Sequence, residues 1–230
     1  MFWRHRVAMA SYFQDDSRES QMIELFGLIK DENEGRSGID AFLQIHDQLV
    51  PFELKTTSKG SITTVRDFGP NHIRKWRDKH WLFGFFHKGR EIYKYGSPSM
   101  MQTWIETKGK YIQSDFQLAE ILPEKLTLSD LHKISGEKEV YDFLDAKVIQ
   151  KNQYSKKKYQ QLMDLESGYS PDRMLQILKA RAKYIIERGS TLNNPHIPEN
   201  YFAEWEEISD NHAQTLRRLV SIYLQSQDSD

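Results

Sequence analysis

Two acidic residues and one lysine, spread over two short apolar runs, are the side chains in this sequence best placed to do chemistry. Asp40 opens the first run, and Glu53 and Lys55 lie in the second run, one residue apart. Because side chains alternate between the two faces of a strand, Glu53 and Lys55 point to the same side. In an antiparallel hairpin Asp40 joins them, so the three groups meet at one edge of a sheet.

Such a set of groups suits the hydrolysis of a phosphodiester bond. Two carboxylates, with the main-chain carbonyl of Leu54 as a further ligand, supply the oxygen atoms that Mg²⁺ prefers. Bound Mg²⁺ stabilises charge on phosphate oxygens and lowers the pKa of an attacking water. The ammonium of Lys55 orients that water and offsets the charge that builds on phosphorus. The sequence therefore predicts a Mg²⁺ site with Asp40, Glu53 and Leu54 as ligands.

A Glu-x-Lys pattern alone carries little information, because exposed ion pairs of this kind are common. The chain contains a second copy at residues 106–108, in a segment with helical periodicity. The copy at Glu53 and Lys55 differs because it lies in an apolar strand, where charged side chains have to be paired or used. The competing interpretation is an ordinary ion pair between these two residues on an exposed edge strand.

The segments around these residues predict an alternation of helices and strands. In chain order we expect a helix over 17–34 that ends at Gly35, a hairpin of strands over 38–45 and 49–56, a loop over 57–69, a helix over 70–79, and strands over 80–86 and 91–95. The assignments rest on apolar periodicity and on glycine and proline at the boundaries.

The rest of the chain reads as mainly helical. Helices are expected over 98–107, from 114 onward, over 170–189 and over 199–225. The third of these begins with Ser170 and Pro171, a good cap and first-turn pair. The sequence therefore predicts an α/β catalytic core over residues 1–135 and a helical region over 136–230.

The composition excludes several classes of protein. There is no cysteine, which rules out disulfides, thiolate metal sites and cysteine nucleophiles. No stretch approaches the ~20 apolar residues of a membrane span, so we expect a soluble, cytoplasmic protein. The net charge of −1 argues against a purely electrostatic coat on nucleic acid, but not against local basic patches. Two groups of cations lie at 147–158 and 173–188.

Around the candidate residues the sequence resembles the PD-(D/E)xK nuclease superfamily, and type II restriction endonucleases most closely. The resemblance covers roughly residues 17–96. It lies in Gly38-Ile39-Asp40, in Val50-Pro51-Phe52-Glu53-Leu54-Lys55, and in Thr56-Thr57-Ser58-Lys59-Gly60, which leads to an aromatic-rich strand. Ile39 stands where the motif name has proline, at a position that varies within the superfamily.

The resemblance implies a restriction-endonuclease-like fold, with a mixed central β-sheet flanked by helices. It also implies Mg²⁺-dependent cleavage that leaves a 5′-phosphate, with Asp40 and Glu53 as metal ligands and Lys55 as the catalytic lysine. Glu24 matches the acidic residue that some members place near the metals from the preceding helix. A restriction endonuclease cuts double-stranded DNA at a short specific sequence, belongs to a restriction-modification system in a prokaryotic cytoplasm, and commonly works as a homodimer on a palindrome.

Candidate contacts to DNA lie in the loop after the second strand and in the helix that follows. Hydroxyls, backbone amides and cations there suit contacts to phosphates or bases. The candidates are Thr57, Ser58, Lys59, Thr63, Thr64 and Arg66 in the loop, and His72 and Lys75 in the helix. The competing interpretation is a solvated loop followed by a solvated helix face.

Three functions fit these observations. The first is a type II restriction endonuclease, and the second is a structure-selective DNA repair or recombination nuclease of the same fold. The third is a non-catalytic nucleic-acid-binding module, in which the spacing of Glu53 and Lys55 is accidental. The helical region is expected to serve DNA grip, dimerisation or both.

Overall fold

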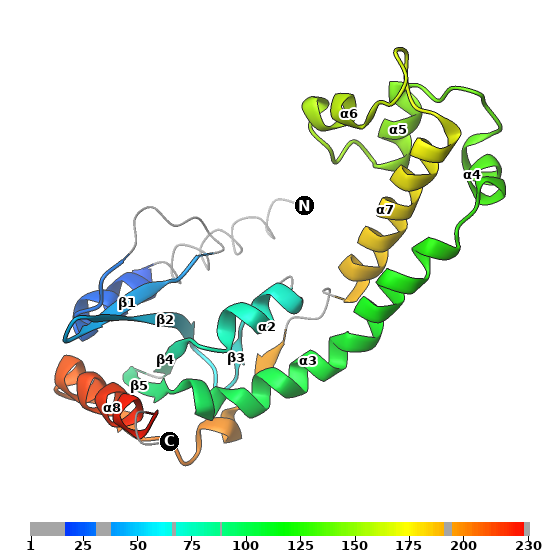
Figure 1. Ribbon diagram of the computed structural model, residues 1–230. Helices are drawn as coiled ribbons and strands as arrows, with labels where there is room; N and C mark the ends of the chain where they lie inside the picture. The colour runs from blue at the N-terminus through cyan, green and yellow to red at the C-terminus, as the bar shows by residue number, and fades with distance from the viewer. Residues whose placement is uncertain (1–16, 31–37, 66–67, 88, 191–194, 228–230) are drawn as a thin grey trace. The chain divides into compact units, whose positions relative to one another are not determined.

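The chain combines a mixed β-sheet with helices in the computed structural model of Figure 1. The structure describes residues 17–30, 38–65, 68–87, 89–190 and 195–227. It has two compact units, Met1–Gly109 with Asn194–Asp230, and Lys110–Asn193. This division differs from the expected one at residue 135, because the chain leaves the first unit within a long helix and later returns to it.

Five strands of the first unit form the central sheet in the order β1-β2-β4-β5-β7. Their bounds are β1 Ala41–Ile45, β2 Gln48–Thr57, β4 His80–His87, β5 Arg90–Gly96 and β7 Glu207–Ile208. β2 and β4 run parallel and the other neighbours run antiparallel. The predicted mixed α/β architecture is confirmed.

The helices surround the sheet in the first unit and build the second unit. They are a helix over 17–26, α2 (Pro70–Trp76), α3 (Pro98–Ile121), the short 3₁₀ helix η1 (Pro123–Lys125), α4 (Leu128–Ser135), α5 (Phe143–Ile149), α6 (Lys156–Leu162), α7 (Pro171–Ser190), η2 (Glu199–Phe202) and α8 (His212–Gln227). Within the described residues, every helix is too short or too polar to span a lipid bilayer.

The predicted hairpin is present as β1 and β2. Ile45 pairs with Gln48, so the connection is a two-residue turn, and His46 adopts the positive φ (49°) that such turns favour. The register places Ala41 opposite Phe52. Because the two strands are antiparallel, the next pair in this register is Asp40 and Glu53.

The two faces of the sheet bury different side chains. Phe52 and Leu54 lie on one face, in a core cluster with Phe26 of the helix over 17–26 and Leu216 of α8. The alternation of side chains therefore turns Glu53 toward the opposite face.

That opposite face carries an aromatic cluster. Trp81 of β4 lies 5.1 Å, between ring centroids, from Trp76 of α2, which in turn contacts Trp104 of α3. Phe83 of β4 packs edge-on against Phe202 of η2. Burial of rings on this scale anchors α2 and α3 to the sheet beside the candidate residues.

The helix over 17–34 is shorter than predicted. It ends at Phe26, and Gly27 takes a left-handed φ of +61° that suits a residue after a helix end. The chain then turns into an extended segment in which Ile29 bridges Phe42 of β1. The prediction was wrong because the apolar side chains after residue 26 serve the sheet and not a helix; Gly35 lies outside the described residues.

The helix predicted over 199–225 is also wrong in its first half. Residues 199–202 form the 3₁₀ helix η2, and the buried Ile208 belongs to β7 and pairs with Tyr93 at the edge of the sheet. Asn211, with a φ of 43°, separates this strand from α8. Packing against the sheet has overridden the local periodicity.

The loop predicted over 57–69 is partly a strand. β3 (Ile62–Thr63) pairs antiparallel with β6 (His196–Ile197) to form a separate two-stranded sheet. Thr63 and Thr64 therefore hydrogen bond to His196 and Pro195. A partner more than a hundred residues away could not be read from the local sequence.

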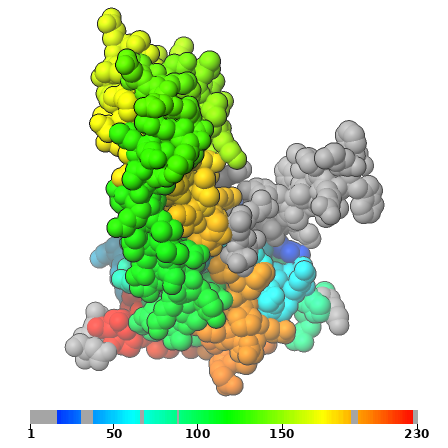
Figure 2. All heavy atoms as spheres, turned by 90° about the vertical axis from the view of Figure 1, so that its right-hand side faces the viewer, coloured from blue at the N-terminus to red at the C-terminus, as the bar shows by residue number. Residues whose placement is uncertain are grey.

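The second unit packs its helices around a core of their own. Its buried residues are Leu131, Tyr141, Ala146, Ile149, Tyr159, Tyr169, Met174, Ile177 and Leu178. The end of α3 and α7 lie side by side in both views (Figures 1 and 2), joined by ion pairs of Lys179 with Glu124, just beyond α3, and of Lys183 with Glu120. Between α6 and α7 the chain makes a tight turn closed by a bridge from Leu165 to Gly168.

His80, at the start of β4, makes the stability of the fold pH-dependent. Its ring is buried, Nδ1 lies 2.6 Å from the hydroxyl of Tyr95, and burial lowers the pKa of His80 from 6.5 to about 4. The folded state thus binds fewer protons than the unfolded state, and its stability falls as the pH drops from 6.5 toward 4, by about 3 kcal/mol in total.

We expect His80→Phe to lack this component of the pH dependence. Its unfolding free energy at pH 7 should itself be lower by about 1–3 kcal/mol, because the hydroxyl of Tyr95 loses its partner. Urea unfolding at a series of pH values between 7 and 4 measures the difference between the two proteins. Parallel curves for both would contradict the assignment.

Candidate active site

Asp40 and Glu53 lie opposite one another across the hairpin. The backbone N–H of Asp40 donates to the carbonyl of Phe52 at 3.2 Å, which extends the pairing of β1 and β2 by one residue. The backbone N–H of Leu54 donates to Oδ2 of Asp40 at 2.8 Å. Because directly opposed residues share a face, both carboxylates lie on the same side of the sheet.

The ammonium of Lys55 lies among three oxygen atoms. Its Nζ is 2.7 Å from the carbonyl oxygen of Leu54, 2.9 Å from Oε1 of Glu53 and 3.4 Å from Oδ2 of Asp40. These three residues are the ones that the sequence predicts as metal ligands. The structure therefore brings the predicted donor set together around a single positive charge.

A second lysine, Lys79, holds the other side of Glu53. Its Nζ lies 2.8 Å from Oε2 of Glu53 and 3.3 Å from the carbonyl oxygen of Gly38. The side chains of both Glu53 and Lys79 are 4% exposed. Each carboxylate oxygen of Glu53 thus faces its own ammonium group, which is the pairing that a buried charge requires.

The ion pairs shift the protonation of these groups. Burial alone would raise the pKa of Glu53, but the nearby ammonium groups of Lys55 and Lys79 outweigh it and lower the pKa from 4.5 to about 2. Burial alone would lower the pKa of Lys55, but the carboxylates of Glu53 and Asp40 outweigh it and raise the pKa. At neutral pH Glu53 is ionised, and Lys55 is a cation that cannot accept a proton.

Two further charged residues adjoin the site. Lys75 of α2 is half-buried, and its pKa is lowered, chiefly by burial, with further electrostatic effects from Glu53, Lys79 and Asp40. The sequence assigned Lys75 to DNA contact, and the structure places it beside the carboxylates. On the preceding helix, the carboxylate whose charge raises the pKa of Lys55 is that of Glu19.

The predicted acidic residue on that helix, Glu24, is exposed. Glu19 and Glu24 are five positions apart, so they point about 140° away from each other around the helix axis. Sequence analysis missed Glu19 and Lys79. A buried carboxylate needs partners for its charge, which favours a second cation near Glu53, but nothing in the local sequence singles out Lys79 as that cation.

The donor set fits a hard divalent cation in its chemistry. Oxygen ligands are offered by Asp40, by Glu53 and by the carbonyl of Leu54. The backbone N–H of Leu54 and the ammonium of Lys55 both contact Oδ2 of Asp40, so neither contact uses Oδ1. Within the described residues, no three histidine, cysteine, aspartate or glutamate side chains gather closely enough to hold a metal by themselves. Mg²⁺ commonly takes one or two carboxylates together with water and substrate phosphates, so two carboxylates suffice.

The predicted DNA contacts fall into two groups. The first group, Thr57, Ser58 and Lys59, lies at and just after the end of β2. The hydroxyl of Thr57 donates to the carbonyl of Ser61, and the backbone carbonyl of Ser58 contacts the ring of the exposed His87. Lys59 is exposed. These residues continue the strand that carries Glu53 and Lys55.

The remaining predicted contacts are engaged elsewhere. Thr64 is buried, and its hydroxyl donates to the carbonyl of Pro195. His72 accepts a hydrogen bond from the backbone of Gly69 and stacks on Phe68, so it serves the start of α2. Arg66 lies outside the described residues.

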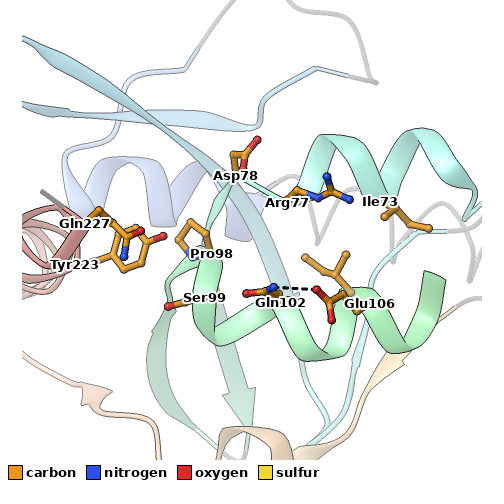
Figure 3. Close-up of a pocket in the computed structure, with 10 residues that line it drawn as sticks. Ile73, Arg77, Asp78, Pro98, Ser99, Gln102, Glu106, Tyr223 and Gln227 are labelled. Atoms are coloured by element: carbon orange, nitrogen blue, oxygen red, sulfur yellow. Dashed lines mark hydrogen bonds between the residues drawn. The ribbon is translucent and has the colours of Figure 1, made fainter. Parts of the chain in front are cut away.

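Two of the hollows in the described part of the first unit are candidates for holding a ligand. One, of about 770 Å³, is lined by Lys59, His87 and Arg90 among others, beyond the carboxyl end of β2. The other, of about 250 Å³, lies where α2, α3 and α8 meet, and Figure 3 shows Arg77, Gln102 and Tyr223 among its lining residues. The second hollow contains none of the predicted site residues, and it has no evident part in their chemistry.

Comparison with known proteins adds no family assignment. No model of a protein family matches the chain, and no curated protein matches it in sequence. The site itself is therefore the basis for a functional proposal.

Proposed function

We propose that this chain is a Mg²⁺-dependent DNA endonuclease whose active site is formed by Asp40, Glu53 and Lys55. The observation that carries the proposal is the convergence of these three groups, with Glu53 nearly inaccessible between two lysines in the middle of a sheet. A buried carboxylate surrounded by cations is costly to maintain for stability alone, and strongly perturbed groups of this kind cluster at functional sites.

Each residue has a role in this chemistry. Asp40 and Glu53, with the carbonyl of Leu54, would hold the metal, which would supply stabilisation of phosphate charge and an activated water. Lys55 remains a cation, so it acts by electrostatic stabilisation of the phosphorane-like transition state and not as a general base. Lys79 fixes the carboxylate of Glu53 in place. Its contact to Gly38 also ties the start of the hairpin to β4.

The resemblance in sequence favours a type II restriction endonuclease within this class. It supports double-stranded DNA as the substrate, cleavage at a short specific sequence, and a homodimer as the working form. The exposed cations beyond β2, Lys59 and Arg90 with His87 beside them, line a hollow on the sheet face that carries Lys55 and suit contacts to the phosphate backbone.

Incubation of the purified chain with a defined plasmid and Mg²⁺ tests the proposal. We expect discrete fragments, and we expect them to disappear both with EDTA and with Asp40→Asn, which keeps the size of the side chain and removes its charge. Mapping the ends of the fragments gives the recognition sequence.

Other outcomes assign the chain differently. Cleavage restricted to junctions, flaps or nicks, and lost in the same two controls, would point to a structure-selective repair nuclease. Cleavage that persists in Asp40→Asn would show that the activity does not come from this site. No cleavage on any of many DNAs would leave a nucleic-acid-binding module as the better proposal.

A further inference from the structure

A segment of the second unit carries a high positive charge without counter-charges in its sequence. Residues 147–162, which span the end of α5, the connection and α6, contain five lysines and no aspartate or glutamate, in a chain whose net charge is −1. These five residues, here named the α5–α6 lysines, are Lys147, Lys151, Lys156, Lys157 and Lys158.

The α5–α6 lysines differ from the other basic group of the chain, on α7. There Lys179 and Lys183 form ion pairs with Glu124 and Glu120, and the buried Arg181 donates to Gln153. No carboxylate in the described part of the chain forms an ion pair with any of the α5–α6 lysines. Lys147 and Lys158 lie over the rings of Phe143 and Tyr154, at 5.5 and 4.6 Å from the ring centroids, which leaves their positive charge without an anionic partner. The charge of Lys179 and Lys183 is thus neutralised within the unit, and the charge of the α5–α6 lysines is not.

The side chains around α6 divide into a buried side and an exposed side that carries the three lysines. Tyr159 is buried and Leu162 is half-buried, which fixes the inward side of the helix. With about 100° per residue, Lys157 lies near the centre of the outward side, and Lys156 and Lys158 lie on its two flanks, about 200° apart. The exposed Gln160 and Gln161 lie between the centre and the flanks.

Contacts within the unit hold α6 firmly in this orientation. The hydroxyl of Tyr169 donates to the carbonyl of Tyr159 at 2.9 Å, and Tyr169 in turn pairs its backbone with that of Tyr141. Gly168 makes this pairing feasible, because a side chain there would lie 2.2 Å from the carbonyl oxygen of Tyr141. The buried amide of Gln150 donates to the carbonyl of Ile177 and anchors the connection between α5 and α6.

We propose that α6 is a DNA-binding helix that seats in the major groove of duplex DNA. The major groove is wide enough to admit a helix and has a phosphate backbone on each side. Cations on both flanks of a helix match two phosphate walls, whereas a flat anionic surface such as a membrane meets one side of a helix. In many DNA-binding proteins two helices are joined by a turn and the second helix lies in the major groove. Here α5 and α6 are two such consecutive helices, and the outward side of α6 is exposed.

The glutamines give α6 the capacity to read bases. Amide side chains near the centre of a docked helix can form paired hydrogen bonds with adenine, while the flanking lysines contact backbone without sequence preference. This surface shares no residue with the Asp40–Glu53–Lys55 site. Its role does not depend on the nuclease chemistry, because binding can be measured without cleavage.

Binding of a fluorescent duplex of about 30 base pairs, a length that exceeds one turn of groove on each side of a docked helix, provides the test. The full chain is used with Asp40→Asn and in EDTA, so that cleavage is absent. The triple variant Lys156→Gln, Lys157→Gln, Lys158→Gln is expected to bind roughly 100-fold more weakly at 0.15 M salt, with a salt slope smaller by about 3, because each lost phosphate contact removes ~0.9 from the slope.

A matched variant controls for the loss of charge. Lys110→Gln, Lys125→Gln, Lys133→Gln removes three exposed lysines from other helices, and we expect it to change the affinity by less than 3-fold or so. Equal weakening in both triple variants, or no weakening in the α6 variant, would overturn the proposal. Loss of binding to phosphatidylserine vesicles that matches or exceeds the loss for DNA would overturn it in favour of a membrane surface.

Discussion

Lys55→Met is expected to reduce the rate of plasmid cleavage in Mg²⁺ by roughly 10²–10³-fold, the usual effect of removing one charge-stabilising group from an active site. The ammonium of Lys55 lies within 3.4 Å of an oxygen atom of each proposed metal ligand, Asp40, Glu53 and Leu54. Methionine preserves much of the volume of the side chain and removes its charge. Single-turnover cleavage, with enzyme in excess over DNA, measures the chemical step.

A second measurement separates catalysis from metal binding. The Lys55 ammonium would compete with Mg²⁺ for the same three oxygen atoms, so Lys55→Met should bind Mg²⁺ at least as tightly as the original chain in a calorimetric titration. Lys133→Met, at an exposed position on α4, serves as the matched control and should cleave at the original rate. Unchanged cleavage by Lys55→Met would remove this lysine from the mechanism.

Lys79→Met is expected to lower the free energy of unfolding by about 3–5 kcal/mol, since it leaves a buried carboxylate short of one partner. The pair of Lys79 and Glu53 is almost inaccessible to solvent, so water cannot replace the lost ammonium. Urea unfolding at pH 7 measures the change. Lys75→Met, at a half-buried lysine of α2 four positions before Lys79, is the control and should change stability by less than about 1 kcal/mol.

Acid unfolding gives this prediction a second readout. Because the pKa of Glu53 is lowered to about 2, its ionised form contributes stability that is present above pH 4.5 and is lost as the pH falls toward 2. Removal of one cation raises the pKa of Glu53 in the folded state toward its ordinary value, so in Lys79→Met this pH-dependent contribution should be smaller and its loss should be complete at a higher pH. Unchanged acid unfolding would mean that Lys79 does not stabilise the charged form.

The double variant Glu53→Met, Lys79→Met completes the cycle. Replacement of both partners of a buried ion pair by apolar side chains is often neutral, so the double variant should be more stable than the sum of the two single changes predicts. It should also be inactive. Recovery of stability without recovery of cleavage would separate the structural role of Lys79 from the proposed catalytic role of Glu53.

The central hairpin could be predicted because its signals are local. Two apolar runs around a short polar connection predicted the hairpin, and the alternation of side chains along a strand predicted that Glu53 and Lys55 share a face. The structure has a two-residue turn where the sequence predicted a three-residue connection over 46–48, and this turn sets the register that places Asp40 opposite Glu53. Local spacing was enough to place Lys55 on the same side. No knowledge of the remaining strands was required.

Lys79 was missed because its position depends on a non-local pairing. β2 and β4 run parallel, with Phe52 beside His80, and that register brings the residue before β4 to Glu53. Apolar strands can pair in several orders, and the sequence does not state which. The same cause explains β7, whose partner β5 lies far away along the chain, so that its residues were taken for part of a helix.

The return of the chain to the first unit has a consequence for how this protein is made. β7 joins the sheet only after the whole second unit has been synthesised, and α8 then supplies Leu216 to the cluster that contains Phe52 and Leu54, the neighbours of Glu53. Contacts in the second unit are close along the chain, so that unit can form early on the ribosome. The core behind the strand that carries Glu53 and Lys55 is complete only after residues 207–220 have been synthesised. If the chain is a DNA endonuclease, an unfinished chain lacks the core behind its active site and poses little danger to the DNA of the cell that makes it.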